Sequence, residues 1–250
     1  MVRNLRNSAF GELVSLSALF HDVGKVIRRS GVNKKHAQAG HSFIKDVLGE
    51  AGELQYILNV ILYHHESKIN LEDIMQKNVV NIVKIADHLN AQERYYSEDQ
   101  PRAWKENIPL LSIMSEIQNI KDNNKPSYKF FDRISELVIT PSEVNILFPQ
   151  KELNSVLGED DKVVSGISKL VLGGYQAIRN RLRKSLHELK TRGLIREDFI
   201  LIPFEKLFTY IPSDTTIQPK LSIYPDISLF DHSKMTATFA RALYNSLFRN

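Results

Sequence analysis

Apolar residues recur at helical spacing along most of the chain, and this pattern predicts a mainly α-helical protein. The first predicted helix carries an apolar stripe from Leu13, continues past the pair His21-Asp22 to Ile27, and is broken at Gly31. Three more apolar stripes with a period near 3.6 residues follow in the first hundred positions. They predict helices at about 43–48, 54–62 and 79–89.

The pattern changes near Gln100-Pro101, where prolines and polar runs replace the regular stripes. We expect a short helix at about 110–120 and a small β-hairpin in this region. Regular spacing then returns and predicts helices at about 163–190, 199–210 and 228–248, the last capped by Ser228 or Asp231. We therefore expect a single domain over 1–250, with core helices at about 1–100 and 163–250 and an insertion at about 101–162.

Composition narrows the class of protein. The chain has 250 residues, is 42% hydrophobic and contains no cysteine, so disulfides and thiolate metal sites are excluded. We find no signal peptide and no apolar run long enough for a membrane span, so we expect no membrane association. The net charge of +4 is compatible with a polyanionic partner, and equally with an ordinary soluble protein that has a slight lysine excess.

The candidate chemistry lies in the first hundred residues, where six of the eight histidines fall between positions 21 and 88. Imidazole and carboxylate together suit divalent transition metals. A His-Asp pair by itself is typical of a helix surface. Here, however, His21-Asp22 follows an apolar helical stretch, and Gly24 and Lys25 follow it, so a small residue and a cation lie one turn away.

Other candidates are individually ambiguous. His64 and His65 end a predicted helix, and neighbouring helical side chains point about 100° apart, so one site uses both only near a frayed end. Asp87 lies in an apolar helix and needs a partner, which a metal, an arginine or a backbone cap would supply. His41 and His232, each taken alone, are typical surface histidines.

Taken together, these residues resemble the HD superfamily of metal-dependent phosphohydrolases. That family orders its ligands as a first His, a His-Asp pair, further histidines and a final Asp. The resemblance implies a circularly permuted HD-domain helical bundle with a small irregular or β-hairpin insertion, because the order in this chain is His21-Asp22, His41, His64-His65, Asp87 and last His232.

A narrower resemblance covers essentially the whole chain. The segments ALFHDVGKVIRRSG, HAQAGHSFIKDVL, IVKIADHLNAQER and YPDISLFDHSKMTATFA are similar to the N-terminal part of the large subunit of type III-A CRISPR effector complexes. The stretches FEKLFTYIPSDTT, IPLLSIMSEI and ILFP fit the same family. The family's full-length subunit continues into palm domains with a Gly-Gly-Asp-Asp motif, so we interpret this chain as an excised domain or a truncated gene product.

The resemblance implies a phosphodiesterase that cleaves single-stranded DNA with one or two divalent metal ions, with manganese, nickel or cobalt as the expected metals. One ion would be held by His21, Asp22, Asp87 and His232. Asp22 would bridge to a second ion held by His41, His64 and His65. The catalytic residues would be His21, Asp22 and Lys25, with Lys25 steadying the phosphate. The expected contacts to DNA are Lys25, Arg179, Arg183 and Lys184, and the alternative for the last three is a solvated helix face.

The implied partners are single-stranded DNA, the remaining domains of the large subunit and the other subunits of the CRISPR ribonucleoprotein complex, in the cytoplasm. Endonuclease and exonuclease action stay open. Two competing functions also stay open at this point. One is an HD-type phosphohydrolase acting on nucleotides or cyclic nucleotides, and the other is a non-catalytic module that mainly docks neighbouring subunits.

Overall fold

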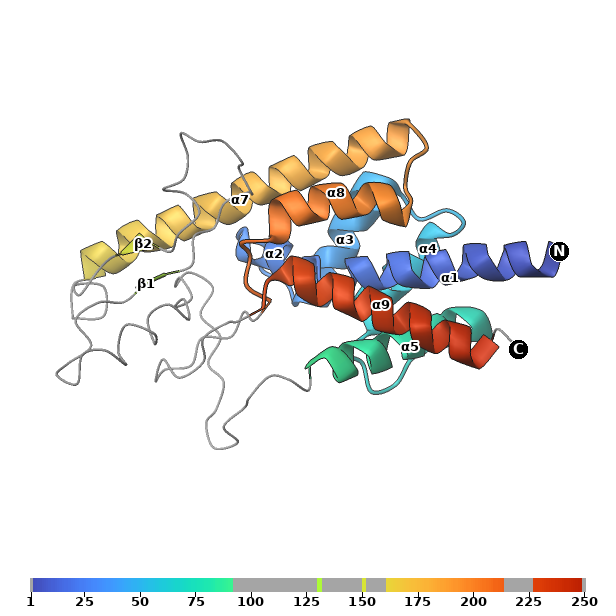
Figure 1. Cartoon of the computed structure of the whole chain (residues 1–250). Coiled ribbons are helices and arrows are strands. Elements are labelled where there is room, and N and C mark those ends of the chain that lie inside the picture. The colour runs from blue at the N-terminus through green and yellow to red at the C-terminus, as the bar shows by residue number, and fades with distance from the viewer. Residues whose placement is uncertain (1, 92–129, 132–149, 152–160, 214–226, 249–250) are drawn as a thin grey trace.

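The protein is a bundle of packed α-helices (Figure 1). This computed structural model describes residues 2–91, 130–131, 150–151, 161–213 and 227–248. Its helices are α1 (Val2–Phe20), α2 (Gly24–Arg29), α3 (His36–Leu48), α4 (Leu54–Tyr63), α5 (Ile74–Ala91), α7 (Asp161–Thr191), α8 (Glu197–Phe208) and α9 (Leu229–Phe248). The predicted mainly helical class is therefore confirmed, and the relation by circular permutation stays a prediction.

The two ends of the described chain form the centre of the bundle. In Figure 1, α1 and α9 run antiparallel to each other, so that both termini lie on the same side of the molecule. Helix α5 packs on the other side of α9, and α4 packs against α1. A single apolar core runs between these helices, with Phe20, Val83 and Ala240 among its fully buried members.

The first predicted helix is broken where the sequence analysis expected it to continue. Helix α1 ends at Phe20, a turn covers 21–23, and α2 begins at Gly24. In this turn the backbone N–H of His21 bonds Ala18 O at 3.3 Å, and that of Val23 bonds Phe20 O at 3.1 Å. These tighter three-residue hydrogen bonds end the α-helical ladder. The His-Asp pair therefore lies between two helices, and its side chains point into the bundle.

Helix α3 begins at His36, seven residues before its predicted start, and two glycines approach each other closely beside its first turns. A Cβ atom built on Gly24 would lie 1.8 Å from the carbonyl oxygen of His36, and one built on Gly40 would lie 2.9 Å from Gly24 Cα. The segment 36–42 has no apolar stripe, so its helical character was not evident from periodicity. It is the backbone-to-backbone contact that places the first turn of α3 beside Asp22.

The second half of the described chain covers this bundle. Helix α7 packs on α2 and α3, and α8 lies between α7 and the α1–α9 pair (Figure 1). Both begin and end within about two residues of the predicted bounds. The N-terminus of α9 is capped as predicted, since the Ser228 hydroxyl accepts a hydrogen bond from the backbone N–H of Asp231 at 3.0 Å.

Only two short strands are described within the predicted insertion. The strands β1 (Phe130–Phe131) and β2 (Gln150–Lys151) pair antiparallel, with Phe130 opposite Lys151. The helix predicted at about 110–120 and most of the region in which a small β-hairpin was expected lie outside the described residues. Among the helices that are described, none is long and apolar enough to cross a membrane.

The Gly24–Gly40 contact predicts a strong, position-specific loss of stability. We expect Gly24→Ala to destabilise the fold at the upper end of the ~1–3 kcal/mol typical of overpacking, because backbone atoms rather than a flexible side chain obstruct the new methyl group. Gly173→Ala is the matched control. Its Cβ would meet nothing within 4 Å, and alanine in a helix is favoured by roughly 0.5–1 kcal/mol. Thermal unfolding followed by circular dichroism measures both, and equal melting temperatures would contradict the contact.

Candidate metal centre

The Asp22 carboxylate lies at the centre of a cluster of histidines, with 2% of its side chain exposed. Its two oxygens face different groups of residues. Asp22 Oδ2 lies 3.3 Å from the Nε2 atoms of both His21 and His232. Asp22 Oδ1 lies 3.7 Å from the Nε2 atoms of His36 and His64. One carboxylate is thus shared by two sets of ligand-type atoms, as a bridging ligand would be.

The first set brings together residues from three parts of the chain. His21 and Asp22 come from the turn after α1, Asp87 from α5 and His232 from α9. Asp87 Oδ1 lies 3.4 Å from His21 Nε2 and 3.1 Å from His232 Nε2. The four ligand-type atoms all lie within 4.8 Å of one another. The four residues expected from the sequence to hold one ion therefore meet in space.

The second set consists of Asp22, His36, His64 and His65. Helix α4 ends at Tyr63, so His64 and His65 follow it in a turn and both rings approach the site. The ring centroids of His64 and His65 are 4.0 Å apart, and that of His36 lies 4.9 Å from His65. Because the helix ends there, two neighbouring histidines can serve one site.

The structure brings His36 into this set, where the sequence analysis had placed His41. The two residues lie five positions apart on α3, which corresponds to a rotation of about 140° around the helix axis. His36 lies on the same face as Gly40, the face that contacts Gly24 two residues after Asp22. His41 is half-buried on another face. Burial and the neighbouring Lys45 ammonium lower the pKa of the His41 imidazole.

Backbone carbonyls orient two of these rings. His21 Nδ1 lies 2.7 Å from Ala18 O, and His64 Nδ1 lies 3.0 Å from Ile61 O. A carbonyl oxygen only accepts, so Nδ1 carries the hydrogen in both rings and each Nε2 is directed at Asp22. In a neutral imidazole this arrangement presents the Nε2 lone pair to the site, which is the state that binds a metal.

The titration behaviour of the cluster follows from its burial and its charges. Burial lowers the pKa of His36 to about 3 and that of His65 to about 4, so both rings are neutral at pH 7. Burial would also lower the pKa of His21, but the carboxylates of Asp22 and Asp87 outweigh it and raise that pKa to about 10. Burial opposes ionisation of Asp22 as well, yet the Lys25 ammonium and the His21 ring hold its pKa well below the usual range.

The residues present fit a divalent metal. Several buried polar atoms around Asp22 have no hydrogen-bond partner among the described residues, namely Nε2 of His21, His36 and His64 and Oδ1 of Asp22. Buried polar atoms of this kind are rare in native proteins and need an explanation, and a bound ion is one. Imidazole nitrogen with carboxylate oxygen is the donor set of first-row transition metals. This chemistry does not select one metal.

Lys25 already has partners in this arrangement. Its Nζ donates to Asp22 Oδ2 at 2.6 Å and to the carbonyl oxygen of Ser213 at 2.8 Å. The side chain is 11% exposed. Lys25 therefore ties the central carboxylate to the segment that leads towards α9. The described contacts support a role in holding Asp22 more directly than the predicted role in steadying a phosphate.

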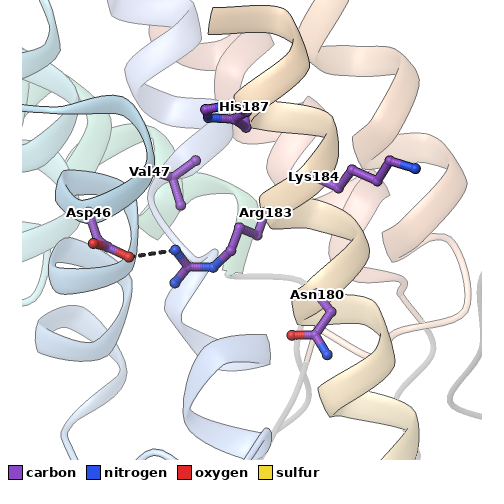
Figure 2. Close-up of a pocket in the computed structure, with 6 residues that line it drawn as sticks. All are labelled: Asp46, Val47, Asn180, Arg183, Lys184 and His187. Atoms are coloured by element: carbon purple, nitrogen blue, oxygen red, sulfur yellow. Dashed lines mark hydrogen bonds and ion pairs between the residues drawn. The ribbon is translucent and has the colours of Figure 1, made fainter.

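Three residues on α7 were predicted to contact DNA, and their surroundings differ from one another. Figure 2 shows Arg183 reaching from α7 to the Asp46 carboxylate on α3, at 2.5 Å, while Lys184 points away from it. The Arg183 guanidinium also lies 5.1 Å from the centre of the Phe43 ring. Arg179 donates to the Ser30 hydroxyl at 3.5 Å. The two arginines thus attach α7 to α2 and α3, and Lys184 remains an exposed cation beside the pocket in Figure 2.

Residues 2–92 match the family model described as "HD domain". This match includes His21, Asp22, His36, His64, His65 and Asp87, and it ends well before His232.

Curated relatives confirm the narrower resemblance. The chain is 28% identical to a Streptococcus thermophilus protein and 23% identical to an Enterococcus italicus protein, with 92% of the chain covered in each case. Both are called "CRISPR system single-strand-specific deoxyribonuclease Cas10/Csm1 (subtype III-A)". These two relatives of the chain are therefore Cas10/Csm1 proteins. The chain spans only 27% and 28% of the lengths of these two relatives.

Solved structures show the same fold. The crystal structure of Csm1 from T. onnurineus matches 95% of the chain with a TM-score of 0.60 and 21% identity. A structure of a Csm1–Csm4 cassette in complex with cA4 matches 93% of the chain with a TM-score of 0.57 and 21% identity. These likenesses cover 29% and 28% of the matched chains.

Two residues of the centre were not identified from the sequence. The signal for His36 was the pair of glycines at 24 and 40, which indicates a close helix crossing but does not say which residue it places near Asp22. The other is Asn90 on α5, whose side-chain nitrogen lies 2.8 Å from His232 Nδ1. It follows Asp87 by three positions and therefore lies on the same face of its helix.

The placement of His36 rather than His41 beside Asp22 can be tested directly by comparing two variants. We expect His36→Ala to lower the amount of manganese bound per chain, because it removes one nitrogen ligand from the second set. His41→Ala should leave it unchanged. Elemental analysis of the purified chain after loading with manganese and removal of excess metal measures both. Loss of metal in His41→Ala and none in His36→Ala would restore the assignment made from the sequence.

Proposed function

We propose that this chain is the HD nuclease part of a type III-A CRISPR large subunit, and that it hydrolyses phosphodiester bonds of single-stranded DNA. The observation that carries the proposal is the sharing of Asp22 between two sets of ligand-type residues, one on each carboxylate oxygen. Two ions bridged in this way suit an in-line displacement at phosphorus. The printed names of the relatives support single-stranded DNA as the substrate class.

We assign the ligands as follows: His21, Asp22, Asp87 and His232 hold one ion, and Asp22, His36, His64 and His65 hold the other. When bound, such ions polarise the phosphoryl oxygen and lower the pKa of water, so that hydrolysis proceeds near neutral pH. Manganese, nickel and cobalt are the ions we expect, because imidazole and carboxylate ligands accept all three and availability decides among them.

The chain's own residues contribute orientation and charge. The carbonyls of Ala18 and Ile61 keep the Nε2 atoms of His21 and His64 directed at the centre. The Lys25 ammonium holds the Asp22 carboxylate against Ser213 and so keeps its two oxygens facing the two sets. On α7, Lys184 is the exposed cation that we assign to the DNA backbone.

Some of the matched structures contain Csm1 together with Csm4, and one of these is in complex with cA4. We infer that this HD domain works next to the remaining domains of a large subunit and the other subunits of a CRISPR ribonucleoprotein, in the cytoplasm. The coverage of 93% of this chain but only 27% of the matched chain in a Csm1–Csm4 subcomplex supports this placement.

Removal of the shared carboxylate should abolish the reaction. We expect Asp22→Asn to lower manganese-dependent cleavage of a labelled single-stranded oligonucleotide by more than about 100-fold, because the amide lacks the negative charge that both sets require. Asp198→Asn, an exposed residue in the first turn of α8, is the matched control and should keep wild-type activity. Equal cleavage by Asp22→Asn and wild type would refute the proposed function, and nucleotide or cyclic-dinucleotide hydrolysis without DNA cleavage would favour the other HD chemistry.

Lys25→Met separates two roles for that residue. If Lys25 holds Asp22, the manganese concentration for half-maximal cleavage rises, and the rate falls by roughly 10-fold with little change in KM for DNA. A phosphate-binding role would instead raise KM and leave the metal requirement unchanged. Steady-state kinetics over a matrix of DNA and manganese concentrations distinguishes the two, with Lys77→Met on α5 measured in parallel as an exposed-lysine control.

A further inference from the structure

The positive charge of this chain is concentrated on the second half of α7. Between positions 179 and 192 the sequence has six lysine and arginine residues and a single carboxylate, Glu188. The net charge of the whole chain is only +4, so this segment accounts for its excess of cations. A surface that gathers charge of one sign attracts a partner of the opposite sign.

Packing decides which of these cations face solvent. One stripe of α7 faces the apolar core and is at most 2% exposed, namely Tyr175, Ile178, Leu182 and Leu186. Arg179 and Arg183 lie beside this stripe and contact α2 and α3. Lys184 projects from the opposite face, and Figure 2 shows it extending away from Asp46.

Lys184 lies between two shallow grooves of about 320 Å³ each and lines both of them. The first groove, drawn in Figure 2, lies between α7 and α3. The second lies between α7 and α8, where Arg181 and Lys184 meet Lys206, and all three side chains are exposed. Glu188 is the one carboxylate among the described residues that line it. We call this second groove the basic groove.

The remaining lining of the basic groove suits a phosphate backbone better than a base. Ser185 adds a hydroxyl, and Pro203 and Leu207 supply its apolar part. None of the described residues that line the groove is aromatic, so the stacking platform that single-strand binding proteins use for bases is missing from this part of the structure. Lysine and arginine contacts to phosphates position a strand without reading its sequence.

The basic groove is separate from the metal centre. Helix α7 packs on α2, α3 and α8, and it contacts α3 at Asp46. Asp46 follows His36 by ten positions, which corresponds to about 15 Å along the axis of α3. Among the described residues that line the groove, none belongs to either set of ligand-type residues. A strand in the groove is therefore held beside the centre and not by it.

We propose that the basic groove is a second DNA-binding surface, which holds the phosphate backbone of the single-stranded substrate outside the metal centre. This inference rests on the proposed function. It extends the DNA contact from Lys184 alone to cations of two helices, Arg181 and Lys184 on α7 and Lys206 on α8. The surface contributes binding and no chemistry, and it is indifferent to the order of the bases.

The salt dependence of DNA binding tests this surface without any turnover. Fluorescence anisotropy measures the affinity of the chain in EDTA for a labelled single-stranded oligonucleotide over a series of salt concentrations. Each phosphate contact to a single strand contributes about 0.7 to the slope of log K against log salt, so we expect Lys184→Met/Lys206→Met to reduce the slope by about 1.4. Lys77→Met, which removes an exposed lysine from α5, is the control and should leave the slope unchanged.

An unchanged slope in the double variant, or an equal reduction in Lys77→Met, would overturn the inference. A second series uses an RNA strand of the same sequence, and a reduction confined to RNA would overturn the assignment to the DNA substrate. Circular dichroism checks that the double variant is folded. If it is not, Lys184→Met alone replaces it, with an expected reduction of about 0.7.

The binding measurement also separates this inference from the function on which it rests. A chain that cleaves no DNA with any divalent metal, together with the expected change of slope, would refute the proposed nuclease function and retain the DNA-binding surface. A chain that cleaves DNA, together with an unchanged slope in the double variant, would refute the surface alone.

Discussion

Burial of the Asp22 carboxylate imposes the strongest constraint on this fold. An ionised carboxylate taken out of water costs several kcal/mol unless cations or donors compensate it. Here the compensating groups are Lys25, His21 and His232, which come from α2, the turn after α1 and α9. When one partner of a buried charged pair is lost, the remaining charge stays buried and its full desolvation cost is no longer compensated. The helices that carry these residues are therefore bound to one another through a single side chain.

Close backbone packing makes this convergence possible. The turn at 21–23 separates α1 from α2 and directs the His-Asp pair inward. The absence of side chains at Gly24 and Gly40 then allows α3 to approach within contact of α2. Any side chain at Gly24 would collide with the His36 carbonyl and push His36 away from Asp22. Two glycines without chemistry of their own thus decide which histidine reaches the centre.

The centre also requires contact between distant parts of the chain. The HD-domain match covers 2–92, and the described α9 begins at Leu229. Helix α9 packs on α1 and α5 and brings His232 between Asp22 and Asp87. Its register is set by Asn90 and Thr236 as well as by the apolar core. The HD-family segment alone would hold three of the four residues of the first set.

A large part of the fold and of the site was predictable from the sequence. Apolar periodicity located most helices, because burial on one face repeats every 3.6 residues whatever the neighbours are. Asp22, His64, His65, Asp87 and His232 were identified from residue type, from order along the chain and from resemblance. The break at His21-Asp22 was not identified, because the apolar stripe continues through it.

The sequence by itself determined which helices form, which imidazoles and carboxylates are present without any cysteine, and the order in which these residues occur along the chain. The tertiary structure alone decided that His36 rather than His41 reaches Asp22, that Asn90 contacts His232, and that Arg183 pairs with Asp46. These outcomes depend on helix crossings and on rotation about helix axes. A turn of about 140° between two histidines of one helix changes no local pattern, yet it moves one of them out of the site.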